Sequence, residues 1–254
     1  MTHRVIRYLT LVAVLAVVAA APKEKSKPKT PCAPSIAACP DQGCGGELDE
    51  FLNRRKNIRS DNQTATPRTL AWIKKLDDPE HFTENESREE LAALGEGQMI
   101  SVVAYVIEAK AELGGESCNC HLQTKETTDN HLVLVTKATV DKFPITGNKK
   151  TDKNVFQSRE RESITAEFTP RVRASHPHFT RETVQPLIDD SPQQALLVRV
   201  TGLLMFDSEH FIRNALPRVT NWEIHPVFKF EVCPKGKKCT AGSDANWQSV
   251  DDLP

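Results

Sequence analysis

The sequence of 254 residues contains none of the short motifs that mark three common classes of enzyme. It has no Gly-rich phosphate loop, no Gly-x-Ser-x-Gly elbow and no His-Glu-x-x-His. The first motif is used by nucleotide hydrolases, the second by serine hydrolases and the third by zincins. The sequence therefore gives no support for any of these classes.

The chain also lacks an excess of charge of either sign. Its 33 Lys and Arg residues nearly balance 34 Asp and Glu residues. A balanced chain does not capture nucleic acid by bulk electrostatics, although a local basic patch is compatible with this composition. Tyrosine is scarce, with two residues, so few such rings are available for stacking on bases.

A long apolar run is absent beyond the first 21 residues. His3, Arg4 and Arg7 precede an apolar segment over 9–18, a pattern typical of an export signal, and we predict cleavage near Ala21. The apolar segment is shorter than the roughly 20 residues of a membrane span, although an uncleaved anchor is the alternative. The sequence thus predicts a secreted or periplasmic protein without stable membrane insertion after cleavage.

Composition divides the rest of the chain into four parts. Residues 22–46 form a Lys/Pro- and Cys-rich linker, and residues 47–97 have the apolar spacing of a short helical lead-in. Residues 98–232 are rich in strand-forming residues, and residues 233–254 form a Cys-containing tail. We expect one elaborated domain.

Five runs within 98–232 have the composition of strands. They are Met99–Ala109, Asp129–Thr136, Glu162–Phe168, Leu196–Phe206 and Trp222–Val232. Thr180 is placed to cap a short helix between the third and fourth runs. The insertion 137–161 is polar and contains Gly147-Asn148, so we predict a disordered or hairpin excursion there.

This order of elements is that of the OB fold. We predict a mainly β protein: a five-stranded OB-like barrel with one helix between strands 3 and 4, preceded by a short helical region. An immunoglobulin-like sandwich is the competing fold, but it needs about seven strands and has no place for the helix.

Alternation along two strands predicts which side chains fill the barrel. The expected inward residues are Trp222, Ile224, Phe228 and Phe230 of the fifth strand and Ile164, Ala166 and Phe168 of the third. The expected outward residues are Glu223, His225, Lys229 and Glu231, and Ser163, Thr165, Glu167, Thr169 and Arg171. The polar set is predicted to form one outer surface and its rim.

OB folds bind ligands across strands two and three and with the loops that join strands one to two and four to five. Those loops, 111–128 and 207–221, are long here, and charged residues concentrate in them. We predict a secreted binding module for an anionic or oligomeric ligand, such as an oligonucleotide, oligosaccharide or envelope component. The predicted ligand-binding residues are Arg171, Arg173, His178, Arg213, Arg218 and His225. Anion binding requires Arg171, Arg213 and Arg218 to converge on one concave patch.

Three pairs of a carboxylate and a histidine predict a second kind of site. They are Asp129 with His131, Asp207 with His210, and Glu223 with His225. Such pairs hold a divalent metal ion or perform acid-base chemistry. The predicted metal ligands are Asp129, His131, Asp207 and His210, with Glu167 as a further candidate.

These metal ligands suggest a metal-dependent phosphodiesterase or nuclease as the alternative function. A third alternative is a structural domain without a small-molecule site, in which each histidine is only held in place by its neighbouring carboxylate.

Cysteine usage agrees with export. Seven cysteines form an N-terminal group, a central pair and a late pair: Cys32, Cys39 and Cys44; Cys118 and Cys120; Cys233 and Cys239. We predict that the central and late pairs are oxidised, and that a Cys233–Cys239 bridge is the obvious short closure. An odd number leaves at least one thiol without a partner in the chain. A zinc site of Cys118, Cys120, His121 and the late pair is the alternative.

Several segments of the sequence resemble a family of exported bacterial proteins that has no assigned activity. They are Gly43-Cys44-Gly45, Leu52-Asn53, Lys56-Asn57, Gly114–Cys120, Asp129–Leu134, Glu167–Arg171, Val200–Gly202, Phe206–His210 and Trp222–Val227. The resemblance spans roughly residues 39–232 and implies a periplasmic or secreted protein with an OB-like barrel. A more distant likeness is to staphylococcal-type nucleases, whose Arg, Asp and Glu pattern does not map onto matched positions here.

Overall fold

The computed structural model describes residues 30–44, 50–60, 62–79, 81–83, 86–211 and 217–253. The predicted export signal and its cleavage site lie outside these residues, and so does Arg213. None of the helices within the described ranges is long and apolar enough to cross a membrane.

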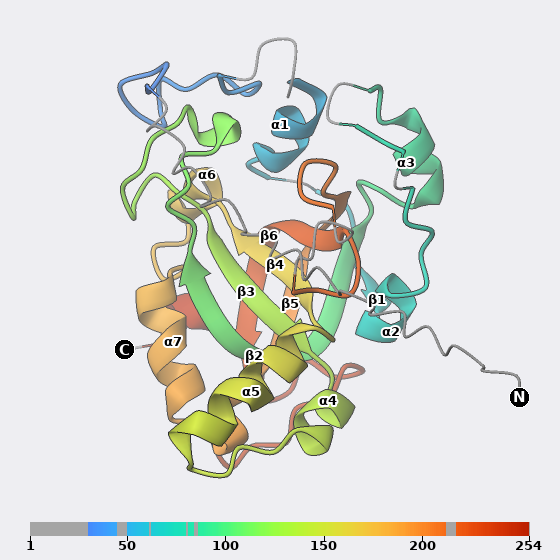
Figure 1. Ribbon diagram of the computed structural model, residues 1–254, viewed down its shortest axis with the longest axis vertical. Coiled ribbons are helices and arrows are strands. Elements are labelled where there is room, and N and C mark those ends of the chain that lie inside the picture. Colours follow the sequence, from blue (N-terminus) through green and yellow to red (C-terminus); the bar gives the residue numbers. More distant parts are fainter. Residues whose placement is uncertain are drawn as a thin grey trace, which may run out of the picture.

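Five strands close into a barrel at the centre of the molecule (Figure 1). They are β2 (Met99–Ala111), β3 (Asn130–Val135), β4 (Ile164–Phe168), β5 (Leu196–Phe206) and β6 (Trp222–Val232). The order is β2-β3-β4-β6-β5, and β5 pairs back onto β2. The β4–β6 pair is parallel, whereas the other barrel pairs are antiparallel. The predicted mainly β, five-stranded OB-like barrel is therefore confirmed.

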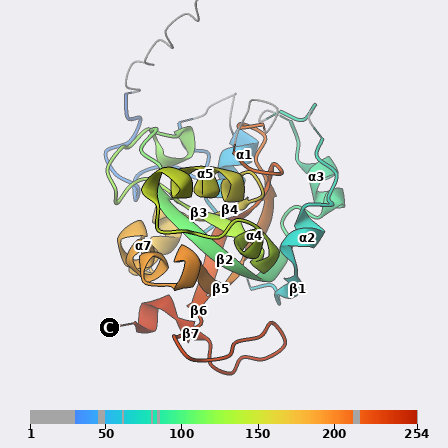
Figure 2. The same cartoon turned by 60° about the horizontal axis from the view of Figure 1, so that its bottom comes forward.

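Two very short strands extend the sheet beyond the barrel. β1 (Thr66–Arg68) pairs in parallel with β2, and β7 (Gln248–Ser249) pairs antiparallel with the end of β6. β7 and the following turn η4 (Val250–Asp252) keep the C-terminal residues beside the barrel (Figure 2).

Helices occur before the barrel and between its third and fourth strands. The region before the barrel contains α1 (Glu50–Lys56), α2 (Leu70–Ile73) and α3 (Glu89–Leu94). Between β4 and β5 lie α6 (Pro170–Arg173), α7 (Arg181–Asp189) and the turn η2 (Pro192–Gln194). α7 is the predicted helix: the Thr180 side chain accepts a hydrogen bond from the Thr183 N–H and so caps its first turn.

The prediction for residues 137–161 is wrong, because this insertion forms two helices, α4 (Lys137–Lys142) and α5 (Lys149–Glu160). Thr136 caps the first helix, and the Asn148 side chain accepts from the N–H groups of Lys150 and Thr151 at the start of the second. Gly147-Asn148 is thus a helix start and not a hairpin turn. α5 is mostly polar and covers the barrel with Phe156 and Arg159; the Arg159 side chain donates to the carbonyl oxygens of Phe143 and Gln193.

The barrel interior is apolar and closely packed. The inward residues predicted for β4 are fully buried, and Phe168 stacks on Phe179 at 4.6 Å between ring centroids. In β6 the alternation changes phase: Gly202 of β5 pairs with Val227, which takes an interior position, and Phe228 is only partly buried. A Cβ atom on Gly202 would lie 2.3 Å from the Pro226 carbonyl oxygen, so this close approach of β5 and β6 requires glycine.

The outer face of β3, β4 and β6 is also buried at the upper end of the barrel, where solvent exposure was predicted. Glu223 and His225 are each 1% exposed and Glu167 is 4% exposed. The reason is a second layer, in which α1, residues 30–44 and the loop after β2 lie over this end of the sheet (Figure 1). Lys229, farther along β6, is exposed as predicted.

All seven cysteines lie in described residues, and six of them form disulfides. Cys233–Cys239 confirms the predicted short closure, whereas Cys32–Cys44 and Cys39–Cys120 fasten the N-terminal segment. The prediction that Cys118 is oxidised is wrong, because its thiol is free and buried. The alternative zinc site is also wrong, because Cys120 and the late pair are bonded elsewhere. Cys120 has a left-handed backbone with φ 54°, which turns the chain so that neighbouring cysteines face different partners.

Candidate functional site

Helix α1 is clamped onto the loop that follows β2 by two asparagines one helical turn apart. The Asn53 amide donates to the Gln42 carbonyl oxygen at 2.9 Å and to the Ser117 hydroxyl at 3.1 Å. The Asn57 amide donates to the carbonyl oxygens of Asp41 and Cys118, each at 2.9 Å. These bonds bind three segments of backbone together over the outer face of the barrel.

Gly43 permits the closest approach in this second layer. Its φ is +64°, and a Cβ atom there would lie 2.1 Å from the Ser117 carbonyl oxygen. Only glycine combines that backbone conformation with that contact. Together with the Cys39–Cys120 disulfide, Gly43 fixes residues 116–120 against the N-terminal segment.

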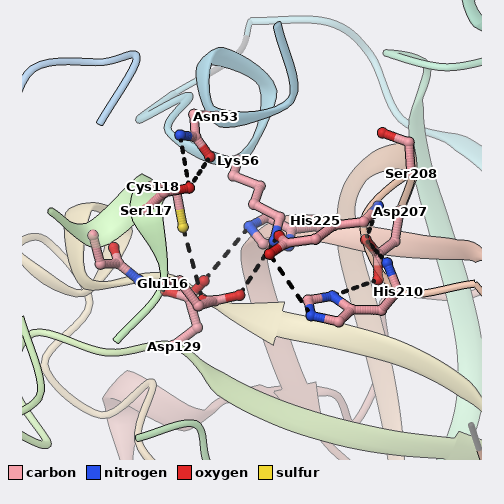
Figure 3. Close-up of polar contacts among 12 residues, drawn as sticks. Asn53, Lys56, Glu116, Ser117, Cys118, Asp129, Asp207, Ser208, His210 and His225 are labelled. Carbon is pink, nitrogen blue, oxygen red and sulfur yellow. Dashed lines mark hydrogen bonds and ion pairs between the residues drawn. The ribbon is translucent and has the colours of Figure 1, made fainter. Parts of the chain in front are cut away.

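Lys56 is the charged residue that α1 places beneath the second layer. It is 3% exposed, and its Nζ lies 3.2 Å from Glu116 Oε1 and 3.6 Å from Glu209 Oε2. Burial lowers the pKa of Lys56, but the neighbouring carboxylates outweigh burial and raise that pKa well above its usual value. Lys56 is therefore a fixed ammonium between the loop after β2 and the loop after β5 (Figure 3).

Asp129, Glu167 and His225 form the centre of the site. They come from the start of β3, from β4 and from β6, and each offers a ligand atom within 4.8 Å of those of the other two. His225 Nδ1 lies 3.2 Å from Glu167 Oε2 and 3.1 Å from Glu223 Oε1, and its Nε2 lies 3.9 Å from Asp129 Oδ2. Register explains the meeting, because β4 pairs with both β3 and β6 at this level.

His131 joins the centre across the β3–β4 pair. It faces Glu167 in the register, with 3.0 Å between Nε2 and Oε1. Burial lowers the pKa of His131, but the Glu167 carboxylate prevails and raises that pKa to about 9. Burial also lowers the pKa of His225, but the Glu167 carboxylate outweighs burial and raises that pKa well above its usual value.

One buried atom of this centre has unused hydrogen-bonding capacity. Within the described residues, His225 Nε2 has no hydrogen-bond partner and lies 3.9 Å from Asp129 Oδ2, whereas His131 Nε2 and Glu167 Oε2 are each in an ion pair. Most buried polar atoms in proteins are satisfied, so His225 Nε2 points to a missing occupant beside Asp129.

A second group of possible ligands adjoins the first through Asp129. Glu116, Cys118 and Asp129 also offer ligand atoms within 4.8 Å of one another, and Cys118 Sγ lies 3.7 Å from Glu116 Oε2. Burial and then the charges of Glu116 and Glu167 raise the pKa of Asp129 to about 8. Burial and Glu116 likewise raise the pKa of the Cys118 thiol well above its usual value. These shifts favour the protonated, neutral forms of Asp129 and Cys118.

The loop after β5 contributes a second ion-pair network. Arg218 donates to Asp207 Oδ2 at 2.6 Å and to Glu223 Oε2 at 3.1 Å, while His210 Nδ1 lies 3.3 Å from Asp207 Oδ2. The hydrogen bond with Asp207 raises the pKa of His210 to about 9. Burial raises the pKa of Asp207, but His210 and Arg218 outweigh burial and hold it far below its usual range.

A cavity of about 500 Å³ opens between the central group around Glu167 and the ion-pair network of the loop after β5. It lies between the loops after β2 and after β5, where the OB fold predicts a ligand. Six carboxylates line it: Glu112, Glu116, Glu160, Glu167, Asp207 and Glu209. Five basic residues line it too: Lys56, Lys110, His131, His210 and Arg218.

The predicted ligand-binding residues lie in several places. Arg218 lines the cavity, whereas His225 is buried and contacts Glu167, one of the lining residues. Arg171 donates to the carbonyl oxygens of Cys39 and Pro40, and Arg173 to those of Lys125 and Thr128. His178 meets the Val250 carbonyl oxygen near the C-terminus. Arg171 therefore does not share the cavity with Arg218, and the position of Arg213 is not described.

The predicted metal ligands are divided between two groups. Asp129 and His131 belong to the central group, whereas Asp207 and His210 pair with each other beyond Lys56 (Figure 3). Sequence reasoning missed Lys56 and Glu116, and it grouped Cys118 with Cys120, His121 and the late cysteines. The available signal for Glu116 was a charged residue near Cys118 within a Gly/Ser/Asn turn, but nothing local linked Lys56 to that turn.

Comparison of the chain with protein-family models, with curated proteins and with solved structures found no match. The resemblance to an exported bacterial family stays a prediction.

Proposed function

We propose that this protein is an exported metal-dependent phosphodiesterase or nuclease. A divalent cation bound by Asp129, Glu167 and His225 would activate a water molecule against a phosphate group in the cavity. The observation that carries the proposal is the convergence of these three buried ligands, with His225 Nε2 lacking a hydrogen-bond partner.

The ligand types suit a transition metal or zinc. Two carboxylates and one imidazole are a common ligand set for zinc and manganese, whereas magnesium and calcium prefer oxygen alone. Glu167 and His225 lie in β4 and β6 of the closed barrel and Asp129 immediately precedes β3, so the site would be rigid. Glu167 also lines the cavity, which gives a bound cation a route to the substrate.

The charges of the cavity favour an anionic substrate only when the cation is present. Its lining has six carboxylates against three residues that are always cationic, Lys56, Lys110 and Arg218, together with two histidines. Without a metal ion, an entering anion would meet at least as much negative as positive charge in the cavity lining. A divalent cation reverses that balance and leaves Lys56 and Arg218 in place to orient a phosphate.

His210 is suited to the role of proton donor. Its side chain is 48% exposed, it lines the cavity, and a pKa of about 9 keeps it protonated at neutral pH. A protonated imidazole beside the leaving oxygen would supply the proton that the leaving group needs. Asp207 holds the imidazole in place, as the orienting carboxylate does in other acid-base pairs.

The test is a metal and activity measurement on protein purified from an oxidising compartment. Inductively coupled plasma mass spectrometry should find a bound divalent metal. Bis-p-nitrophenyl phosphate and single-stranded DNA should be hydrolysed, and EDTA should abolish hydrolysis. Glu167→Gln should lower metal content and reduce hydrolysis on the order of 100-fold or more. The control is Glu108→Gln, because Glu108 is a half-exposed carboxylate on β2 that does not line the cavity.

A second candidate is a binding module without catalysis, for an oligonucleotide, an oligosaccharide or an anionic envelope component. It is favoured by the position of the cavity between the two loops that OB folds use for ligands. Metal-dependent retention of an oligonucleotide without turnover would select this function. If the protein binds no metal, retains no oligonucleotide and shows no turnover, a structural domain is the remaining function.

Export is supported by the three disulfides, which form and persist in oxidising compartments. Secretion or a periplasmic location fits that environment.

A further inference from the structure

We infer that the buried centre binds a second cation between Glu116, Cys118 and Asp129, with Asp129 bridging the two metal ions, and that the Cys118 thiolate makes this second position selective for zinc-like metals. The inference rests on the first cation position of the proposed function and deepens it. It concerns which metals bind and how many, and not the reaction.

The two groups of ligands share one residue. Asp129 belongs to the group with Glu167 and His225 and also to the group with Glu116 and Cys118. A carboxylate has two oxygens, so it can bind one ion with each. A bridging carboxylate of this kind is compatible with the two-metal arrangement used for phosphoryl chemistry, in which the ions lie about 3.5–4 Å apart.

The distances between possible ligands are compatible with metal coordination. The Cys118 thiol donates a hydrogen bond to Glu116 Oε2, with 3.7 Å between the two atoms. A zinc ion with a sulfur at about 2.3 Å and an oxygen at about 2.1 Å in tetrahedral geometry would separate them by about 3.6 Å. His225 Nε2 and Asp129 Oδ2 are 3.9 Å apart, too far for a hydrogen bond but within reach of one shared ion.

The two carboxylate oxygens of Glu116 have different partners. Oε1 faces the Lys56 ammonium at 3.2 Å, and Oε2 faces the Cys118 thiol. Lys56 thus neutralises one side of the carboxylate and leaves the other side for an ion. On Asp129, Oδ1 accepts from the Asn119 amide at 3.1 Å, which fixes the orientation of the carboxylate.

The surroundings of Cys118 are unusual for a free thiol. A buried free cysteine commonly packs as a small apolar residue, but Cys118 is 1% exposed and lies beside the carboxylates of Glu116 and Asp129. Its neighbour Cys120 and all other cysteines are disulfide-bonded. A softer ligand among carboxylates favours zinc or cobalt over magnesium or calcium. His225 Nε2 has no hydrogen-bond partner and faces Asp129 Oδ2, the carboxylate that the two groups share, so an ion is missing beside this bridging residue.

The test is metal stoichiometry combined with cobalt spectroscopy on the full exported chain. Protein stripped with a chelator is loaded with Co²⁺ or Zn²⁺, and metal per chain is measured by mass spectrometry. We expect two ions in the wild type and one in Cys118→Ser. We also expect a thiolate-to-cobalt charge-transfer band in the wild type that Cys118→Ser and Cys118→Ala lack. His225→Gln should keep this band because it alters the other cation position.

The outcomes separate this inference from the proposed activity. Two ions and the thiolate band without hydrolysis would support the second cation and refute the phosphodiesterase. One ion, no thiolate band and active hydrolysis would refute the second cation and support the phosphodiesterase. Melting curves of both Cys118 variants identify a loss of fold, and in that case the wild-type band and stoichiometry alone decide.

Discussion

Phe168 and Glu167 are neighbours in β4, and both are almost fully buried, but on opposite sides of the barrel wall. Phe168 packs on Phe179 and Phe230 inside the barrel. Glu167 lies on the outer side with His131 and His225. The interior is buried because its side chains avoid water, whereas the outer face is buried because other segments of the chain cover it.

This difference separates stability from function. Burial of apolar surface contributes directly to folding, while burial of several charges costs free energy unless they are paired or bind an ion. The covering segments are held by disulfides and by hydrogen bonds from Asn53 and Asn57. The covering segments therefore bury a charged cluster beneath α1, and the barrel alone would leave this cluster exposed to water.

The largest effect should come from breaking the covalent attachment of the second layer. Cys39 and Cys120 are separated by 81 residues, whereas Cys233 and Cys239 are separated by six. Chain-entropy arguments give about 4.5 kcal/mol for the first bridge and about 2 kcal/mol for the second. Urea unfolding of the two double Cys→Ala variants should show that order. Equal losses would mean that the second layer is held without the long-range bridge.

Two substitutions compare the two sides of the wall in the metal-free protein. Phe168→Ala should lower the free energy of unfolding by about 3–5 kcal/mol, because a fully buried ring is replaced by a cavity. Asp129→Asn should change it by less than about 1 kcal/mol at neutral pH, because burial, Glu116 and Glu167 raise the pKa of Asp129 to about 8 and Asn keeps the shape of the neutral side chain. Denaturant titrations of both variants measure this contrast. A large loss for Asp129→Asn would show that the outer charges stabilise the fold.

Metal addition should stabilise the outer face selectively. A cation that binds only the folded chain adds about 2.7 kcal/mol at a free concentration 100 times its dissociation constant. Wild-type protein should therefore melt at a higher temperature with zinc than with EDTA. Asp129→Asn should lose this increase, while Phe168→Ala should keep it from its lower starting temperature. Unchanged zinc stabilisation in Asp129→Asn would contradict the assignment of the ligands.

The smallest effect should be the pH dependence from His210. Its pKa is raised from 6.5 to about 9 by Asp207, so protonation is linked to folding. The stabilisation is fully present below about pH 6.5 and is lost as the pH rises through about 9. Wild type should exceed His210→Gln in stability at about pH 6, and the difference should shrink at about pH 10. A difference that does not change with pH would exclude the charged pair with Asp207.

Much of the barrel could be predicted because its signals are local. β5 and β6 have the predicted bounds, and the Thr180 cap identified α7 from a few adjacent residues. The two helices of the insertion 137–161 were not predicted, because they are polar on most sides and show no helical spacing of apolar residues. The phase change in β6 was missed because it depends on how β5 pairs at Gly202.

The candidate site was predicted in part. The loops were correctly expected to meet at one end of the barrel, and the pairs of a carboxylate and a histidine were visible in the sequence. Lys56 and Glu116 were missed because they are 60 residues apart and meet only in the folded chain. Arg171 and Arg173 were expected to bind a ligand, but they bind backbone carbonyls of segments distant in sequence.

The sequence by itself determined the strands, the apolar interior and the short Cys233–Cys239 closure, because alternation and spacing act between residues close along the chain. The tertiary structure decided which polar residues are buried, because burial of the outer face depends on α1 and the N-terminal segment lying over it. It also decided that Cys39 bonds Cys120 and leaves Cys118 beside Glu116 and Asp129. The whole charged cluster combines side chains from five separate segments, those of Lys56, Glu116, Asp129, Glu167 and His225, and only the folded chain sets the distances between them.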